Sequence, residues 1–147
     1  MALKLRLRPH ERVVINGCVV QNAGRRYTLT IGNFAQIIRG CDLLQEDEAD
    51  TPIRRAYFVI QSMLLDPKSV EQYGEVIAGM MAKLYVALPK AAHQEQILRA
   101  MDHVGERDYY KALACLRPVM AYEETVLPGV RPLRPRVDGS VGVAEGS

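Results

Sequence analysis

Residues 3–20 read LKLRLRPHERVVINGCVV, and this stretch decides the fold of the first part of the chain. Apolar and basic residues alternate strictly over 3–8, so a β-strand would place three leucines on one face and three cations on the other. Asn16-Gly17 is typical of a tight hairpin turn because both residues tolerate positive φ. The stretch therefore predicts a strand with one basic face, followed by an antiparallel hairpin.

Strand patterns continue beyond this stretch. Residues 27–31 alternate again, and a further strand is predicted over 34–39 after the Gly32-Asn33 turn. Together with the hairpin, these patterns predict five short strands in one small antiparallel sheet. Residues 1–44 are interpreted as a basic antiparallel β domain.

The hydrophobic period changes after residue 50. Asp50-Thr51-Pro52 combines capping side chains with a proline at the first helical position, which is typical of a helix start. Apolar residues at helical spacing follow, interrupted by further stop and start signals. We predict about four helices in a domain at 51–122, and hence an α+β fold class.

Residues 123–147 have a different composition, with repeated proline and glycine and few large apolar side chains. Such a segment buries too little surface to offset the entropy lost on ordering. A flexible, disordered tail is therefore expected over 123–147.

The net charge of +2 conceals an uneven distribution along the chain. Residues 1–40 carry seven cations against the lone carboxylate of Glu11, whereas residues 41–51 carry five carboxylates and no cation. This asymmetry favours a polyanionic partner for the first part of the chain. The acidic stretch is expected to supply negative charge at the start of the first helix.

Nothing in the sequence indicates catalysis, a cofactor or a metal site. Cys18, Cys41 and Cys115 form no CxxC pair and are expected to be small buried thiols. His93 and His103 are ten residues apart, not the four that would place two ligands on one helix face. We therefore expect no enzyme activity, no metal and no cofactor.

The sequence also predicts a cytoplasmic protein with no membrane partner. No apolar run approaches the roughly 18–20 residues of a membrane span. The N-terminus alternates charge with leucine, whereas a signal peptide requires an uninterrupted apolar stretch.

The basic strand face is the pattern that suggests a binding site. Side chains at alternate strand positions lie about 6.6–7 Å apart, close to the phosphate repeat of an extended nucleic-acid strand. Arginine suits phosphate and base edges. The alternative is a polar edge strand that only guards against aggregation. The candidate RNA-binding residues are Lys4, Arg6, Arg8, Arg12, Arg25, Arg26 and Arg39.

Several motifs resemble the FlbT family of bacterial flagellum biosynthesis regulators. They are MALKL at 1–5, PHERVVING at 9–17, EADTP at 48–52 with Arg55 and Tyr57-Phe58, and Leu65-Asp66-Pro67. The resemblance covers about residues 1–122. It implies post-transcriptional control of flagellin through the 5′ untranslated region of its mRNA. Repression with faster message decay is the usual outcome in the family, and some members act positively.

Residues 5–17, LRLRPHERVVING, are also similar to the opening of CsrA-type RNA-binding regulators. That resemblance implies RNA contacts by Arg6 and Arg8 on the first strand and by Arg39 on the last, and a strand-exchanged dimer. The chain departs from the pattern at His10, where a glycine is usual, and at Leu7, where a second arginine is common.

The preferred functional hypothesis is an RNA-binding repressor that blocks translation of flagellin mRNA or promotes its degradation. The helical domain is expected to bind a protein partner or to form a homo-oligomer. The alternative is a protein-only adaptor or secretion chaperone that binds flagellin or another flagellar regulator. The apolar helical stripes and the tyrosines of the second domain favour that alternative.

Overall fold

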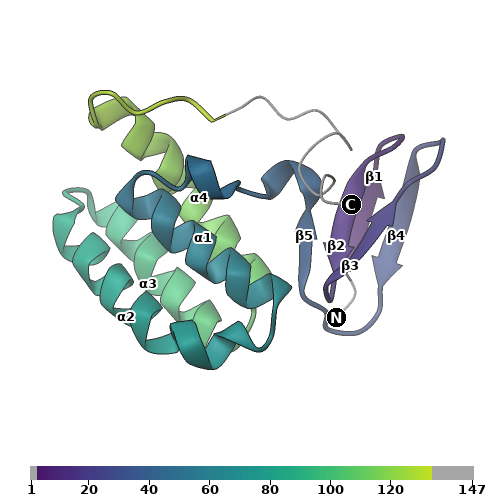
Figure 1. The fold of residues 1–147 in the computed structure, drawn as a ribbon, viewed down its shortest axis with the longest axis horizontal. Helices are drawn as coiled ribbons and strands as arrows, with labels where there is room; N and C mark the ends of the chain where they lie inside the picture. The colour runs from purple at the N-terminus through teal and green to yellow at the C-terminus, as the bar shows by residue number, and fades with distance from the viewer. Residues whose placement is uncertain (1–2, 134–147) are drawn as a thin grey trace. The chain divides into compact units, whose positions relative to one another are not determined.

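The computed structural model describes residues 3–133, which divide into two compact units (Figure 1). The first, here called the β unit, comprises the described residues up to Leu43. The second, the helical unit, comprises Leu44–Leu133. Strands in the first unit and α-helices in the second confirm the predicted α+β class.

The β unit contains two antiparallel sheets. In one of them, β1 (Leu3–Leu7) pairs with β4 (Tyr27–Ile31). In the other, β2 (Arg12–Ile15) is the central strand between β3 (Cys18–Gln21) and β5 (Ile37–Arg39). The predicted strands are present, but the expectation of one continuous sheet was wrong because the backbone ladder of β1 is made with β4 alone.

The alternation in β1 sorts its side chains as predicted. Leu5 and Leu7 are 2% and 3% exposed, whereas Lys4 and Arg6 are exposed. Strands β2 and β5 add further buried apolar side chains to the core of this unit, namely Val13, Val14, Ile37 and Ile38.

The hairpin between β2 and β3 turns at Asn16 and Gly17, as predicted. Their φ angles are 50° and 82°, the positive values that a tight hairpin turn requires. Asn16 also holds the chain ahead of β5. Its N–H donates to the Gln36 carbonyl at 2.7 Å, and its Oδ1 accepts from the Gln36 N–H at 2.8 Å. Strand β5 begins just after this contact, at Ile37, rather than at residue 34.

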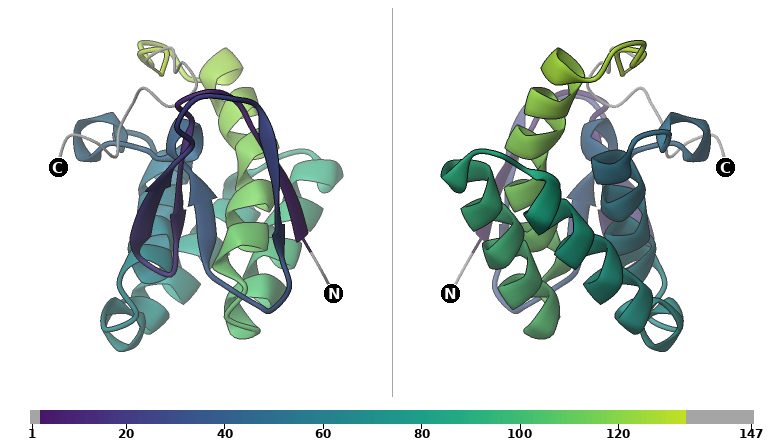
Figure 2. Two further views of the ribbon diagram at one scale, coloured as in Figure 1. Left: turned by 90° about the vertical axis from the view of Figure 1, so that its right-hand side faces the viewer. Right: turned by 90° about the vertical axis from the view of Figure 1, so that its left-hand side faces the viewer.

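The helical unit contains α1 (Pro52–Leu65), α2 (Ser69–Ala87), α3 (Ala91–Gly105) and α4 (Tyr109–Val126). Helix α4 packs against both α1 and α3, and α2 packs against the same two helices (Figures 1 and 2). The four helices thus surround one apolar core, whose fully buried members include Ile53, Ile60, Ile77, Ile97, Leu113 and Leu116. Two short 3-10 helices, η1 (Gly40–Asp42) and η2 (Glu46–Glu48), precede them.

Two helices begin with a side-chain cap, and the first of them is the start predicted at Thr51-Pro52. The Thr51 hydroxyl accepts from the Arg54 N–H at 3.2 Å, and Pro52 occupies the first helical position. At the start of α4, the Asp108 carboxylate accepts from the Lys111 N–H at 3.3 Å. These side chains satisfy backbone donors that have no partner within the helix.

The end of the helical unit differs from the sequence prediction. Helix α4 contains Pro118 and continues to Val126, so residues 123–126 do not belong to the flexible tail predicted over 123–147. Glu123 is 5% exposed and is bound to the start of α1, a tertiary contact that local composition does not reveal. Residues 134–147 of the predicted tail lie outside the described residues.

The cysteines also differ from expectation. Cys18 follows the hairpin turn directly and is exposed, while Cys41 and Cys115 are half-buried, so the prediction of three buried thiols was wrong. Burial raises the pKa of the Cys115 thiol.

Candidate nucleic-acid interface

The pairing of β1 with β4 builds a basic surface. Residues directly opposite in an antiparallel pair point to the same face. The register therefore places Lys4 beside Thr30 and Arg6 beside Thr28. These four side chains, with Arg39 from β5, line an open depression of about 720 Å³, which we call the basic groove.

Lys4 and Arg6 supply the accessible charge of the basic groove. Both are exposed, and within residues 3–133 neither side chain has an ion-pair partner. Their alternate positions on β1 place them about 6.6–7 Å apart along the strand. Two cations at this spacing attract a ligand that carries regularly repeated negative charge.

The guanidinium of Arg39 is fixed by Glu11 and by the backbone of Arg6. It pairs with the carboxylate of Glu11, and both terminal nitrogens donate to the Arg6 carbonyl oxygen at 3.3 Å. The Glu11 side chain is 2% exposed and also accepts from the Arg8 N–H at 2.9 Å. Arg39 itself is 25% exposed, so its guanidinium is fixed in position yet reaches solvent. It also links β5 to β1 through a side chain where no backbone ladder joins them.

The structure brings together three of the seven predicted RNA-binding residues. Lys4, Arg6 and Arg39 line the basic groove, whereas the other four do not. Arg8 follows β1, and Arg12 is half-buried at the start of β2. The remaining two, Arg25 and Arg26, are exposed in the loop that leads into β4.

Asn22 holds the loop that carries Arg25 and Arg26, here called the arginine loop, close to the end of β1. Its side-chain amide donates to the carbonyl oxygens of Arg8, at 2.9 Å, and of Arg25. It is 9% exposed, so these hydrogen bonds form largely out of contact with water. The backbones at Arg8 and Arg25 are therefore neighbours, although these residues lie 17 positions apart.

Sequence reasoning missed the two threonines of the groove and the buried partner of Arg39. The alternation of YTLTI at 27–31 contained the signal for Thr28 and Thr30, but their place beside the cations depends on the register with β1. Glu11 is the lone carboxylate of a basic segment, and this isolation was a signal that it forms a specific ion pair with one of the cations.

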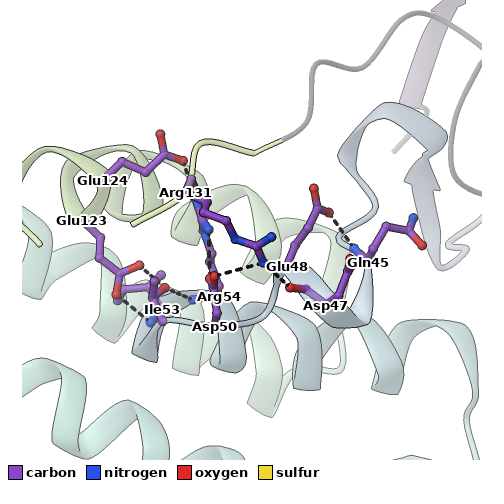
Figure 3. Close-up of polar contacts among 10 residues, drawn as sticks. Gln45, Asp47, Glu48, Asp50, Ile53, Arg54, Glu123, Glu124 and Arg131 are labelled. Atoms are coloured by element: carbon purple, nitrogen blue, oxygen red, sulfur yellow. Dashed lines mark hydrogen bonds and ion pairs between the residues drawn. The ribbon is translucent and has the colours of Figure 1, made fainter. Parts of the chain in front are cut away.

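The start of α1 carries a second polar cluster, centred on Arg54, which is 1% exposed (Figure 3). Its guanidinium donates to Asp50 at 3.0 Å, to Glu124 at 2.9 Å and to the Arg131 carbonyl at 2.8 Å. Arg131 reaches back to the Asp47 carbonyl at 3.0 Å. The cluster therefore ties the chain after α4 to the acidic segment before α1.

The acidic segment thus has partners within the helical unit. Burial raises the pKa of Asp50, but the hydrogen bond and charge of Arg54, with the charge of Arg131, outweigh it and lower the pKa overall. Nearby, Glu123 accepts from the Thr51 hydroxyl and from the Ile53 N–H, the latter at 3.1 Å (Figure 3). A carboxylate at a helix N-terminus is stabilised by the helix dipole, so Glu123 acts as an additional cap for α1.

Residues 3–133 contain no group of three or more potential metal ligands, and none of their helices is long and apolar enough to cross a membrane. Fold and groove together define a small α+β protein whose basic surface suits a polyanionic ligand. More particularly, the chain belongs to the FlbT family, since the family model described as "Flagellar protein FlbT" matches residues 3–127.

Curated relatives agree with this assignment. The chain is 38% identical over 124 residues to the "Probable flagellum biosynthesis repressor protein FlbT" of Caulobacter sp. (strain K31), covering 84% of this chain and 95% of the relative. It is 36% identical to the "Flagellum biosynthesis repressor protein FlbT" of Caulobacter vibrioides (strain ATCC 19089 / CIP 103742 / CB 15), covering 84% and 88%. It is 35% identical to the "Probable flagellum biosynthesis repressor protein FlbT" of Rhodopseudomonas palustris (strain TIE-1), over 86% of this chain and 98% of the relative.

No solved structure matches the chain. The family resemblance seen in the motifs is confirmed by these matches, and the names of the relatives describe regulators of flagellum biosynthesis.

Proposed function

We propose that this chain represses flagellin synthesis after transcription by binding the 5′ untranslated region of flagellin mRNA. The relatives named as flagellum biosynthesis repressors support the regulatory part of the proposal. The basic groove carries the RNA part, because Lys4, Arg6 and Arg39 converge there from β1 and β5. A leader bound in the cytoplasm is then blocked from translation or directed to degradation.

Binding is driven by phosphate contacts with the groove. Lys4 and Arg6 replace counterions on two phosphates of the leader, which makes affinity fall as salt rises. Arg39 is pre-positioned by Glu11, so ordering its side chain on binding costs little entropy. The cations outside the groove, Arg8, Arg12, Arg25 and Arg26, extend the positive field along the β unit.

The two parts of the chain have different tasks in this proposal. Residues 1–44 form the RNA-binding domain. Residues 51–122 form the domain that binds a protein partner or joins copies of the chain into an oligomer.

The test is a gel shift of the full chain on flagellin leader RNA across a salt series. The variant Lys4→Ala/Arg6→Ala removes the two unpaired cations of the groove at exposed positions. Removing one cation that neutralises a phosphate of single-stranded RNA lowers the slope of log affinity against log salt by about 0.7. The slope should therefore fall by about 1.4 in the double variant.

The matched control is Lys68→Ala/Lys83→Ala, which removes two exposed cations from the helical unit. It changes the net charge equally and should leave the slope unchanged. The proposal is wrong if the groove variant binds leader RNA as tightly as the unmodified chain, or if both double variants weaken binding equally.

A second candidate function is a protein-only adaptor or secretion chaperone for flagellin or another flagellar regulator. The helical unit favours it, because Val76 and Val86 of α2 and Leu98 of α3 are 49%, 80% and 52% exposed. A purified chain that captures flagellin but no leader RNA would support this candidate over the first.

A further inference from the structure

We infer that Thr28 and Thr30 make the basic groove selective for RNA over DNA by hydrogen bonding to ribose 2′-hydroxyl groups. This inference rests on the proposed function and adds the means by which the groove distinguishes the two nucleic acids. Lys4 and Arg6 do not make this distinction, because phosphate is the same group in both polymers.

The register of β1 and β4 creates a repeat of paired groups. Lys4 lies opposite Thr30 and Arg6 lies opposite Thr28, so each cation has a hydroxyl beside it on the same face. The second pair follows the first after about 6.6–7 Å along the strands. A nucleotide of RNA offers a matching pair, a phosphate and a 2′-hydroxyl, at each step of its backbone.

The two threonine hydroxyls are available for a ligand. Both residues are exposed, and within residues 3–133 neither hydroxyl has a hydrogen-bond partner. A threonine hydroxyl donates one hydrogen bond and accepts others, and a 2′-hydroxyl does the same. DNA lacks that group, so the contact is formed with RNA alone.

Among the described residues, those that line the groove include no aromatic side chain on which a base could stack. Tyr27, at the start of β4, lies opposite Leu7 and therefore points to the other face of the β1–β4 pair. Without a surface for stacking, phosphate and ribose are the main parts of a nucleotide for this lining to contact, and of these the 2′-hydroxyl is the group that differs between RNA and DNA.

The experiment measures affinities of the full chain for single-stranded RNA and DNA of one leader sequence by fluorescence anisotropy. Each hydroxyl contact is expected to contribute about a two- to tenfold preference for RNA. The variant Thr28→Val/Thr30→Val keeps β-branched side chains and should bind RNA and DNA alike, with its DNA affinity unchanged. Thr28→Ser/Thr30→Ser keeps the hydroxyls and should retain the preference for RNA.

A measurement on the unmodified chain is independent of whether the valine variant folds. The leader sequence made with 2′-deoxyribose but with uracil kept differs from the RNA in its 2′-hydroxyls alone. It should bind more weakly than the RNA, by the same factor that separates RNA from ordinary DNA. Equal affinity of the unmodified chain for RNA and DNA overturns the inference and leaves the proposed function standing, as does a valine variant that weakens both in proportion. Binding of neither polymer by the unmodified chain overturns the proposed function itself.

Discussion

The carboxylate of Glu11 lies buried against the guanidinium of Arg39 and fixes that side chain at the wall of the basic groove. The same carboxylate accepts from the Arg8 N–H, so it joins the end of β5 to the turn after β1. A buried charge is tolerated when its partner and hydrogen bonds are all in place. Glu11 therefore links the stability of the β unit to the shape of its groove.

Replacing Glu11 by glutamine should destabilise the β unit. Glutamine keeps the size of the side chain but leaves Arg39 without its ion pair and the Arg8 N–H with a weaker acceptor. Hydrogen bonds to charged groups contribute about 1.5–3 kcal/mol, so we expect a loss of about 2 kcal/mol in the free energy of unfolding. Urea denaturation measures it. The control Glu95→Gln removes the exposed pair with Arg99 and should cost under about 1 kcal/mol.

Replacing Asn22 by alanine should loosen the arginine loop. The change leaves the Arg8 and Arg25 carbonyl oxygens without a buried donor, at a cost of about 1–3 kcal/mol. Amide hydrogen exchange should speed up over residues 22–26 more than in the helical unit. Exchange that stays as slow as in the unmodified chain would show that Asn22 does not hold the loop.

Replacing Glu123 by alanine should weaken the start of α1 although the change is made in α4. The Ile53 N–H and the Thr51 hydroxyl lose their buried acceptor, and we expect a loss of about 2 kcal/mol in unfolding free energy. Urea denaturation followed by helical circular dichroism measures the change. Glu75→Ala, at an exposed position of α2, is the matched control and should have little effect.

The Asp50–Arg54 pair predicts acid sensitivity of the helical unit. The pKa of Asp50 in the folded protein is lowered from its ordinary 3.8, so its contribution to stability is complete above about pH 4. That contribution is lost as the pH falls through the lower, folded-state pKa. Asp50→Asn should therefore lower the melting temperature at pH 7 and have a smaller effect near pH 2.

Thermal melts at the two pH values measure this difference, with the exposed Asp102→Asn as control. A deficit of the Asp50 variant that is the same at both pH values would contradict the assigned ion pair.

Local chemistry made most of the fold predictable. The strict alternation over 3–8, the Asn16-Gly17 turn and the Thr51-Pro52 helix start each act through neighbouring residues, and each has the predicted structure. The extension of α4 to Val126 was missed because its cause, the contact of Glu123 with the start of α1, joins residues 70 positions apart.

The candidate site was predictable only in part for the same reason. The pattern of charge indicated Lys4, Arg6 and Arg39 among its seven candidates, and the similarity to CsrA-type regulators also indicated Arg6 and Arg39. The threonines became part of the groove through the register of β4 on β1, and Glu11 through an ion pair across 28 positions. The division into two sheets also depends on such distant pairing. Hydrophobic periodicity and turn residues are local patterns and do not show which strands pair.

The groove draws its side chains from residues as far apart as Lys4 and Arg39. A ribosome that is still making the chain releases β1 first, as an isolated peptide of alternating leucine and cation. The complete basic groove cannot exist before residue 39 of 147 has left the exit tunnel. A growing chain therefore passes through an interval in which Lys4 and Arg6 are already exposed but the groove is not yet assembled.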